Sequence, residues 1–197
     1  VLGAQGFIGA RLVERLRGLG HEVDAPPRNA SWLGHKLGIV FYAIGVTHDF
    51  RSRPLDTVNA HVSRLGELLA RGQFDSLVYL SSTRVYQGLS GTVDEMSELL
   101  VNPTRAGDLY NLSKLTGESL ALASGRPVRV VRLSNAYDAQ DRSGNFLSSV
   151  LRAADRGDLT LETTPDSTRD FVSLSDVVSL LPRIALAGRH WLYNLAS

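Results

Sequence analysis

The chain has 197 residues, 43% of them hydrophobic and 21% charged, which is the composition of an ordinary globular protein with a sizeable core. Its 21 Lys and Arg nearly balance 20 Asp and Glu, so the net charge of +1 argues against nucleic acid as a main partner. The absence of cysteine excludes disulfides, thiolate metal sites and cysteine nucleophiles. No apolar run approaches a membrane span, and we expect a cytoplasmic protein of one domain, with or without a small lobe.

The first nine residues join the end of an apolar strand to three glycines, Gly3, Gly6 and Gly9. A helix is predicted next, over Phe7–Leu19, because large apolar residues recur there at helical spacing. Glycine lets the backbone approach a pyrophosphate closely, and the free N–H groups of a helix start attract that anion. Glycines alone also occur in ordinary strand-to-helix turns, but this setting between a strand and a helix indicates a dinucleotide site.

Strand-like and helical patterns then alternate, which predicts βαβ units and a parallel sheet with helices on both faces. The predicted strands are His21–Asp24, Ile39–Ile44, Leu77–Ser81 and Val128–Leu133. The predicted helices between them are Leu55–Ala70 and Leu109–Ala123. The segment 25–38 is too short for the helix and short strand often found there, so it is either compact or incomplete.

Hydroxyl residues follow the strand at Leu77–Ser81, namely Ser81, Ser82 and Thr83. At the carboxyl end of a parallel strand they would lie in the crevice where open α/β sheets bind ligands. The alternative is a turn in which the hydroxyls bond to the local backbone.

Tyr110 and Lys114 are four residues apart in the predicted helix Leu109–Ala123, so they share one face. The ammonium can favour the phenolate and make Tyr110 a usable proton carrier near neutral pH. Such a pair is also common on solvated helix faces, so its meaning depends on the other motifs.

The last third has a mixed pattern. It predicts a helix near Phe146–Asp155, a short strand near Leu159–Glu162, and a helix that Ser175 caps and that reaches Leu186. Pro182 is expected to kink or shorten this last helix. The five histidines show no paired metal-ligand spacing, so no metal is expected.

The glycine turn, the Ser-Ser-x-x-Val-Tyr segment and the Tyr-x-x-x-Lys pair occur in the order typical of the short-chain dehydrogenase/reductase superfamily. The chain resembles its extended branch, the NAD(P)-dependent nucleotide-sugar epimerase/dehydratase family, over nearly its whole length. Three later segments also resemble that branch: Arg132–Tyr137, Arg169–Val172 and Tyr193–Leu195.

The resemblance implies a Rossmann-like, doubly wound α/β fold. Residues 1–135 would form the NAD(P)-binding domain, and residues 136–197 would supply substrate-binding elements interleaved with the last sheet strands. Relatives have several residues before the glycine turn and continue beyond the late strand, so both ends, and the small C-terminal substrate lobe, are expected to be incomplete.

Catalytic roles follow from the resemblance for three residues. Tyr110 would be the acid/base, and Lys114 would lower its pKa and hold the nicotinamide ribose. Ser82 would be the catalytic hydroxyl because it stands four residues before the Tyr of the Val-Tyr pair. Family dehydratases carry Asp-Glu directly after this hydroxyl, where this chain has Thr83 and Arg84, so a dehydratase is disfavoured.

Cofactor contacts are implied at the glycine turn, at a strand end near residue 44, on a helix and beside the catalytic pair. The residues are Gly3, Gly6, Phe7, Ile8, Gly9, Arg28, Ala43, Ile44, Gly45, Asn59, Leu80, Tyr110 and Lys114. The acid that reads the ribose in NAD sites is expected at Pro27, with Arg28 beside it and Asp24 three residues early. An absent acid and a present Arg favour NADP over NAD, unless Arg28 is a solvated loop residue.

Substrate contacts are implied at Asn135 and Arg169, which match positions that bind the diphosphate in many relatives. Thr83 and Arg84 are further candidates, Arg84 for a carboxylate or phosphate. The alternatives are a surface ion pair of Arg169 with Asp166 or Asp170 and a solvent-facing Arg84. His48 and Asp49 face either the substrate or the solvent.

The leading interpretation is an epimerase of a nucleotide-activated sugar. The alternatives are an NADP-dependent reductase of a keto-sugar or small carbonyl and a non-catalytic NAD(P) sensor. Surplus apolar residues on Leu55–Ala70 and Leu109–Ala123 predict a homodimer through these helices, unless the C-terminal lobe covers them.

Overall fold

The computed structural model describes the chain except residues 29, 33, 48, 139–145, 161–163, 165–166 and 197. Its main sheet has the strand order β1-β2-β3-β6, and each neighbouring pair is parallel. The strands are β1 Ile39–Tyr42, β2 Ser76–Ser82, β3 Val128–Leu133 and β6 Leu192–Leu195. An isolated bridge adds Leu2 to the β1 edge. The predicted Rossmann-like parallel fold is therefore confirmed.

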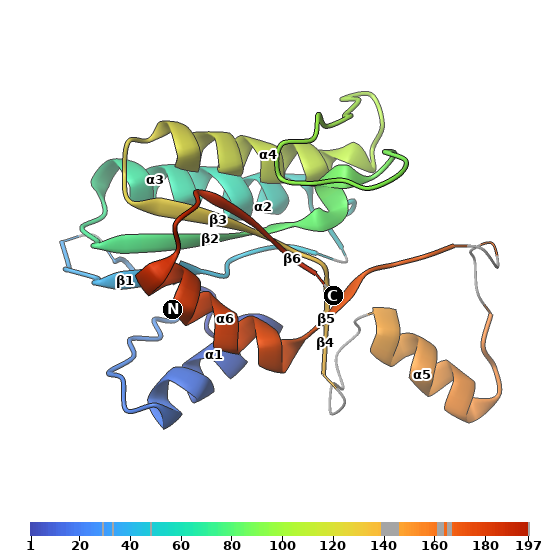
Figure 1. The fold of residues 1–197 in the computed structure, drawn as a ribbon, viewed down its shortest axis with the longest axis horizontal. Coiled ribbons are helices and arrows are strands. Elements are labelled where there is room, and N and C mark those ends of the chain that lie inside the picture. The colour runs from blue at the N-terminus through green and yellow to red at the C-terminus, as the bar shows by residue number, and fades with distance from the viewer. Residues whose placement is uncertain are drawn as a thin grey trace.

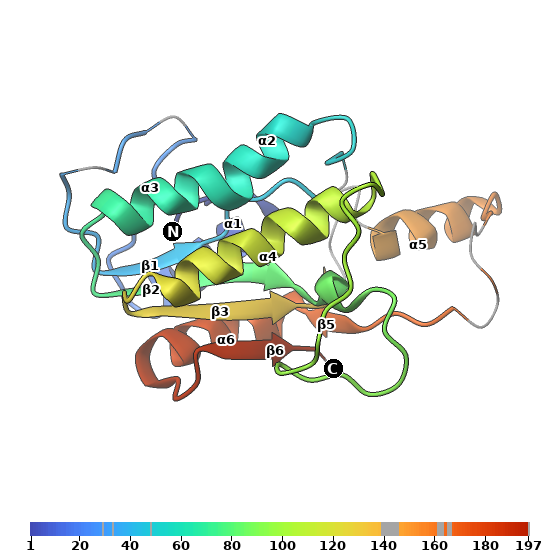
Figure 2. The same ribbon diagram turned by 90° about the horizontal axis from the view of Figure 1, so that it is seen from above.

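Helices cover both faces of this sheet, as Figures 1 and 2 show. One face carries α1 Phe7–Gly18 and α6 Leu174–Ala187. The other carries α2 Pro54–Val58, the π-helix η1 Asn59–Ser63, α3 Arg64–Arg71 and α4 Asp108–Ala123. A short 3₁₀ helix, η2 Thr83–Tyr86, follows β2 directly. The predicted helices at Phe7–Leu19, Leu55–Ala70 and Leu109–Ala123 are thus present.

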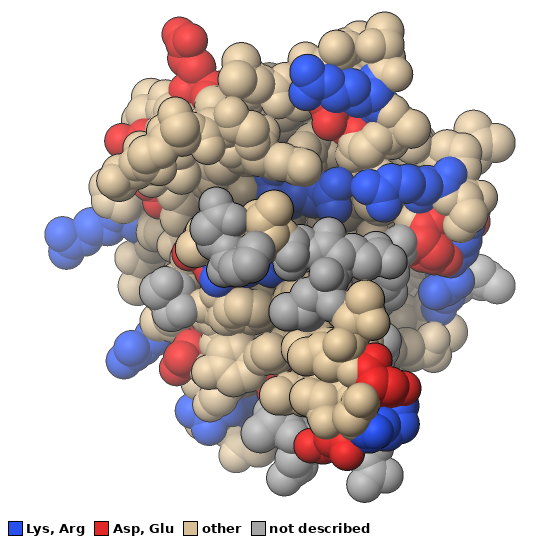
Figure 3. Space-filling view, turned by 90° about the vertical axis from the view of Figure 1, so that its right-hand side faces the viewer, with Lys and Arg blue, Asp and Glu red and all other residues tan. Residues whose placement is uncertain are grey.

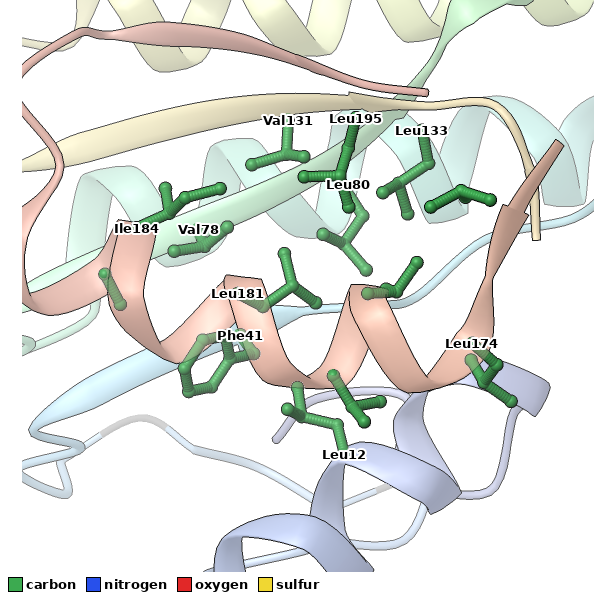
Figure 4. Close-up of a cluster of buried hydrophobic side chains, with 14 of the residues drawn as sticks. Leu12, Phe41, Val78, Leu80, Val131, Leu133, Leu174, Leu181, Ile184 and Leu195 are labelled. Atoms are coloured by element: carbon green, nitrogen blue, oxygen red, sulfur yellow. The ribbon is translucent and has the colours of Figure 1, made fainter. Parts of the chain in front are cut away.

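The layer between the sheet, α1 and α6 is an apolar core (Figure 4). Leu12 of α1 and Leu181 of α6 are fully buried against Val78 of β2 and Val131 of β3. Strands that are covered on both faces need apolar residues on both sides, which explains the continuous apolar run of β2. Burying one such side chain contributes roughly 1.5–3 kcal/mol.

The opposite layer contains the π-helix. A π turn leaves carbonyls without their usual helical donors, and the hydroxyls of Tyr42 and Tyr79 donate to the carbonyls of Ala60 and His61 at 2.7 and 3.2 Å. The π-helix packs closely against α4 at Gly117, where a Cβ would lie 2.7 Å from the carbonyl oxygen of His61. The π-helix therefore turns His61 toward α4, and it is fully buried.

One predicted strand is not formed, and a second lies partly outside the described residues. Residues His21–Asp24 are not in a strand, although the backbone nitrogen of Val1 donates to the Asp24 carbonyl at 2.7 Å. Of the predicted strand Leu159–Glu162, residues 159–160 are not in a strand and the other two lie outside the described residues. The described part of segment 25–38 forms no helix, and it meets the sheet layer through a bridge between Lys36 and Gln73.

The last helix begins earlier than predicted. The cap is Ser173 and not Ser175, because the Ser173 hydroxyl accepts the N–H of Asp176 at 3.0 Å. Pro182 does not shorten α6, which continues to Ala187.

Residues 136–197 contribute both to a separate two-stranded sheet and to the main sheet with its helices. The strands β4 Asn135–Tyr137 and β5 Phe171–Ser173 form a separate parallel pair, and α5 Phe146–Arg156 lies beyond them (Figure 1). The same segment supplies α6 and β6 to the main layers. Within the described residues, no helix has the length and apolar character needed to cross a membrane.

Candidate active site

The candidate site lies where β1 and β2 end, beside the first half of α4. Parallel strands present their carboxyl ends at one edge of a sheet, and Figure 2 shows β2, β3 and β6 running toward the same end of the molecule. This geometry brings the glycine turn, the strand end at Ala43–Gly45, Ser82 and α4 to one edge.

The glycine turn is a tight backbone cradle with no room for a side chain at Gly3 or Gly9. Gly3 has a φ of +84°, and a Cβ there would lie 2.6 Å from the backbone of Ala43. A Cβ on Gly9 would collide with the carbonyl of Gly3. Gly6 caps α1 without a side-chain hydrogen bond, so Phe7 and Ile8 begin the helix with the backbone open to a ligand. This cradle fits the pyrophosphate of a dinucleotide.

Tyr110 is buried in α4 against two rings. The centroids of Phe50 and His61 lie 5.4 and 5.3 Å from that of Tyr110. Burial raises the pKa of the Tyr110 phenol above 10, while a hydrogen bond with Ser82 and the charge of Arg84 act in the opposite direction. Tyr110 is therefore a protonated donor near neutral pH in this state.

Lys114 lies one turn further along the same face of α4 and is also buried. Its Nζ donates to the carbonyl of Leu80 at 2.8 Å and lies 5.9 Å from the Tyr110 ring centroid. Burial lowers the pKa of Lys114 to about 7, against the opposing charge of Glu118. Lys114 was expected to lower the pKa of Tyr110, but the cation that acts against the effect of burial on the phenol in this structure is Arg84.

Ser82 differs from its two hydroxyl neighbours. Its Oγ accepts the backbone N–H of Arg84 at 3.2 Å, so its own proton remains for a second acceptor, either Tyr110 or a ligand oxygen. Ser81 donates to Glu118 at 2.5 Å, and Thr83 donates to the carbonyl of Leu133 at 3.4 Å. Of the three hydroxyls, only Ser82 bonds to Tyr110.

His61 connects two parts of the site and was predicted only to be solvated or packed. Its Nε2 accepts the N–H of Val46 at 3.2 Å, so Nδ1 carries the proton and bonds to Ser113 Oγ at 2.8 Å. Ser113 in turn donates to the carbonyl of Tyr110 at 2.8 Å. Burial, followed by the charge of Lys114, lowers the pKa of His61 to about 2, so the imidazole is neutral.

A buried ion pair joins α4 to β3. Arg132 Nη2 lies 2.7 Å from Glu118 Oε2, and both side chains are almost completely buried. Arg132 also donates to the hydroxyl of Tyr86, which donates to Asn194. Glu118 continues the spacing of Tyr110 and Lys114 along one helix face, a signal that the sequence contains and that its interpretation missed.

The predicted cofactor residues are only partly brought together. A Cβ on Gly45 would lie 3.8 Å from Lys114 Nζ, which places the strand end at Ala43–Gly45 beside Lys114. Asn59 is exposed, and the inward position of that turn belongs to His61. Arg28 is exposed as well, and its carbonyl accepts a hydrogen bond from Arg64.

The predicted diphosphate residues lie together at the second, two-stranded sheet. Asn135 Nδ2 donates to the carbonyl of Asp170 at 2.9 Å, and the guanidinium of Arg169 lies 4.2 Å from the Phe146 ring centroid. Among the described residues Arg169 has no ion pair with Asp170, while Asp166 and His48 lie outside them.

Comparison with known proteins gives a family for this fold and site. The family model described as NAD dependent epimerase/dehydratase family matches residues 33–196. No individually curated protein sequence matches the chain.

Solved structures give the same fold. MoeE5 in complex with UDP-glucose and NAD aligns with a TM-score of 0.81 at 25% identity, covering 100% of this chain and 75% of that one. UDP-glucuronic acid 4-epimerase from Bacillus cereus in complex with NAD gives 0.80 at 20% identity, covering 100% and 76%. RMD from Pseudomonas aeruginosa complexed with NADPH gives 0.76 at 23% identity, covering 99% and 76%.

Proposed function

Because the chain belongs to the NAD dependent epimerase/dehydratase family, we propose that it is an NAD(P)-dependent epimerase of a nucleotide-activated sugar. The observation that carries the proposal is the grouping of Ser82, Tyr110 and Lys114 at the carboxyl edge of the sheet, next to a glycine cradle. The similar structures of MoeE5 with UDP-glucose and NAD support a nucleotide-sugar substrate.

In the proposed reaction the nicotinamide ring, when bound, supplies or accepts a hydride. Tyr110, which is protonated in this structure, donates its proton to the oxygen of a keto-sugar, and Ser82 donates a second hydrogen bond to the same oxygen. In the reverse direction Tyr110 takes the hydroxyl proton, helped by the positive charge of Arg84. Lys114 orients the cofactor ribose from its anchor on the carbonyl of Leu80.

An epimerase oxidises the sugar and reduces it again from the opposite face, so its cofactor is regenerated. The alternative is a reductase, which consumes NADPH stoichiometrically. Thr83 and Arg84 stand where the resemblance places the acid pair of the family's dehydratases. Epimerisation and reduction are therefore both favoured over water elimination. Mass spectrometry of the cofactor released from purified protein separates the two, since retained oxidised nicotinamide indicates the epimerase.

Tyr110→Phe tests the catalytic assignment. The variant should keep the fold and the cofactor affinity and lose at least about a hundredfold in turnover, the scale of a general acid/base. Ser82→Ala should lose roughly ten- to a thousandfold through one oxyanion-type hydrogen bond. Thr83→Ala is the matched control, because the Thr83 hydroxyl bonds to the backbone of β3. Near-normal turnover of Tyr110→Phe would refute the assignment.

NADP is proposed as the preferred cofactor, because no acid stands at the ribose position and Arg28 is exposed beside it. Arg28→Ala should then narrow the difference in binding free energy between NADP and NAD by about 1–3 kcal/mol, as expected for a charge-assisted hydrogen bond. Equal affinities in the wild type, measured by calorimetry, would leave Asp24 as the ribose ligand.

A homodimer through the outer side of α2 to α4 is also proposed. Leu65, Leu68 and Leu69, which the sequence counted as surplus apolar surface, are buried in the core and take no part in it. The exposed apolar residues that remain on these helices are Leu55, Val58, Leu120 and Leu122. They give two neighbouring helices an apolar outer surface, as a two-fold helical contact requires.

A further inference from the structure

Arg84 is a half-buried cation without an anionic partner. Its guanidinium carbon lies 5.0 Å from the ring centroid of Phe50 and 5.5 Å from that of Tyr110. Its Nη2 reaches the carbonyl of Gly107 only at 3.5 Å, and its buried Nε has no hydrogen-bond partner. No ion pair among the described residues includes it. Because an unpaired charge is costly to bury, the missing acceptor is expected on a ligand.

The guanidiniums of Arg132 and Arg126 show what full pairing looks like in this fold. Arg132 bonds to both carboxylate oxygens of Glu118 and to the Tyr86 hydroxyl. Arg126 donates to two backbone carbonyls at 2.9 and 2.8 Å. Among the described residues Arg84 has no carboxylate partner and only the long hydrogen bond to the Gly107 carbonyl, so the fold leaves part of its donor capacity unused.

Neighbouring cations increase the positive potential around Arg84. The guanidinium of Arg51 lies 4.7 Å from the same Phe50 ring. After burial, the charges of Arg51 and Arg169 lower the pKa of Arg84, while Asp108 opposes them. The Asp108 carboxylate is itself engaged by the N–H of Asn102 at 2.8 Å. Figure 3 shows Lys and Arg side chains gathered in a band across this face of the molecule.

The location of Arg84 decides which part of a substrate it would meet. Its backbone N–H bonds to Ser82 Oγ, and its side chain lies over the Tyr110 ring, so both groups that handle the reacting oxygen are its neighbours. The diphosphate is expected at Asn135 and Arg169, which lie at the separate two-stranded sheet of β4 and β5. An anion that Arg84 binds therefore belongs to the sugar. The guanidinium fork matches the two oxygens of a carboxylate.

We propose that Arg84, assisted by Arg51, binds a carboxylate on the reacting sugar, and that the substrate class is the nucleotide-activated uronic acids. This rests on the proposed function and makes it more specific.

The test compares sugar ligands that differ only in the carboxylate. Calorimetry with saturating cofactor measures binding of UDP-glucuronic acid and UDP-glucose, with the two dTDP-sugars in parallel, to wild type, Arg84→Met, Arg84→Lys and Arg53→Met. Arg53 is the control because it is exposed and already paired with Asp49 and Asp56. Cofactor affinity and the thermal midpoint check that each variant is folded.

We expect the wild type to prefer the uronate, and Arg84→Met to lose roughly ten- to a hundredfold of uronate affinity, the scale of hydrogen bonds to a charged group. The affinity for the neutral sugar should fall much less, Arg84→Lys should lie between, and Arg53→Met should match the wild type. Equal losses for both sugars would overturn the proposal and assign Arg84 to the diphosphate. Binding of both sugars without preference would overturn it while the proposed function stands. Cofactor binding with no nucleotide-sugar binding would reject both.

Discussion

The helices on the two faces of the main sheet bury different kinds of side chain. The buried residues of α1 and α6 are all apolar or glycine. The helices on the other face bury His61, Ser113, Lys114 and Glu118, each with a hydrogen-bonded partner. The apolar face stabilises the fold but does not orient individual side chains, because the free energy of hydrophobic burial depends on area and not on direction. The polar face costs desolvation, and in return its hydrogen bonds fix the positions of the reactive groups.

Removing one partner of the buried ion pair should have the largest effect. Glu118→Gln leaves the Arg132 guanidinium buried without its carboxylate, so the free energy of unfolding should fall by about 3–5 kcal/mol. Chemical denaturation measures this. The control is Glu67→Gln, whose exposed pair with Arg71 should be worth less than about 1 kcal/mol. Equal effects of the two variants would show that the buried ion pair contributes no more to stability than an exposed one.

A cavity in the apolar face should affect stability alone. Leu181→Ala removes a fully buried side chain and should cost about 2–5 kcal/mol of unfolding free energy. Leu186→Ala, on the exposed side of the same helix, should change it by less than about 0.5 kcal/mol. At temperatures where both variants are folded, their cofactor affinities should match the wild type. A changed affinity in Leu181→Ala alone would contradict the separation of the faces.

The buried histidine should make stability depend on acid. The unfolded chain takes up a proton on His61 near pH 6.5, whereas the folded pKa is about 2. Between these values the unfolded state binds more protons, so the free energy of unfolding falls as the pH falls. The expected slope is about 1.4 kcal/mol per pH unit.

His61→Asn should remove this slope. The difference in unfolding free energy between wild type and variant should shrink from pH 6.5 to pH 4.5 by about 2 kcal/mol. His190→Asn, at an exposed position, is the control. A difference that does not change with pH would mean that His61 is charged in the folded state.

The smallest effect on stability is expected for the outer surface of the polar face. Leu122→Arg should leave the unfolding free energy of the monomer nearly unchanged, and it should convert the proposed homodimer to a monomer. Leu186→Arg, at a similarly exposed position on α6, should leave the assembly intact. Sedimentation at tens of micromolar measures both. A wild type that is already monomeric would remove the homodimer from the proposal.

Local patterns were enough to predict much of the scaffold. The glycine turn depends on backbone space, which only glycine provides, and Gly3 has the positive φ that its type allows. The apolar run of β2 and the four-residue spacing of Tyr110 and Lys114 follow from the periods of strand and helix. The choice of Ser82 as the catalytic hydroxyl rests on its offset from Tyr86 in the family pattern and stays a prediction, which its effect on the pKa of Tyr110 supports.

The environment of those residues was decided by the tertiary structure. The π-helix that turns His61 inward has no period of its own in the sequence, and the hydroxyls of Tyr42 and Tyr79 that satisfy it come from two distant strands. The pKa values of Tyr110 and Lys114 depend on burial, which spacing along a helix does not reveal. Arg84 likewise reads as a surface cation until the fold places Phe50 and Tyr110 against it. The sequence by itself determined which groups this site contains, and only the packing of distant segments determined their charge, because solvation and neighbouring charges are properties of the folded chain.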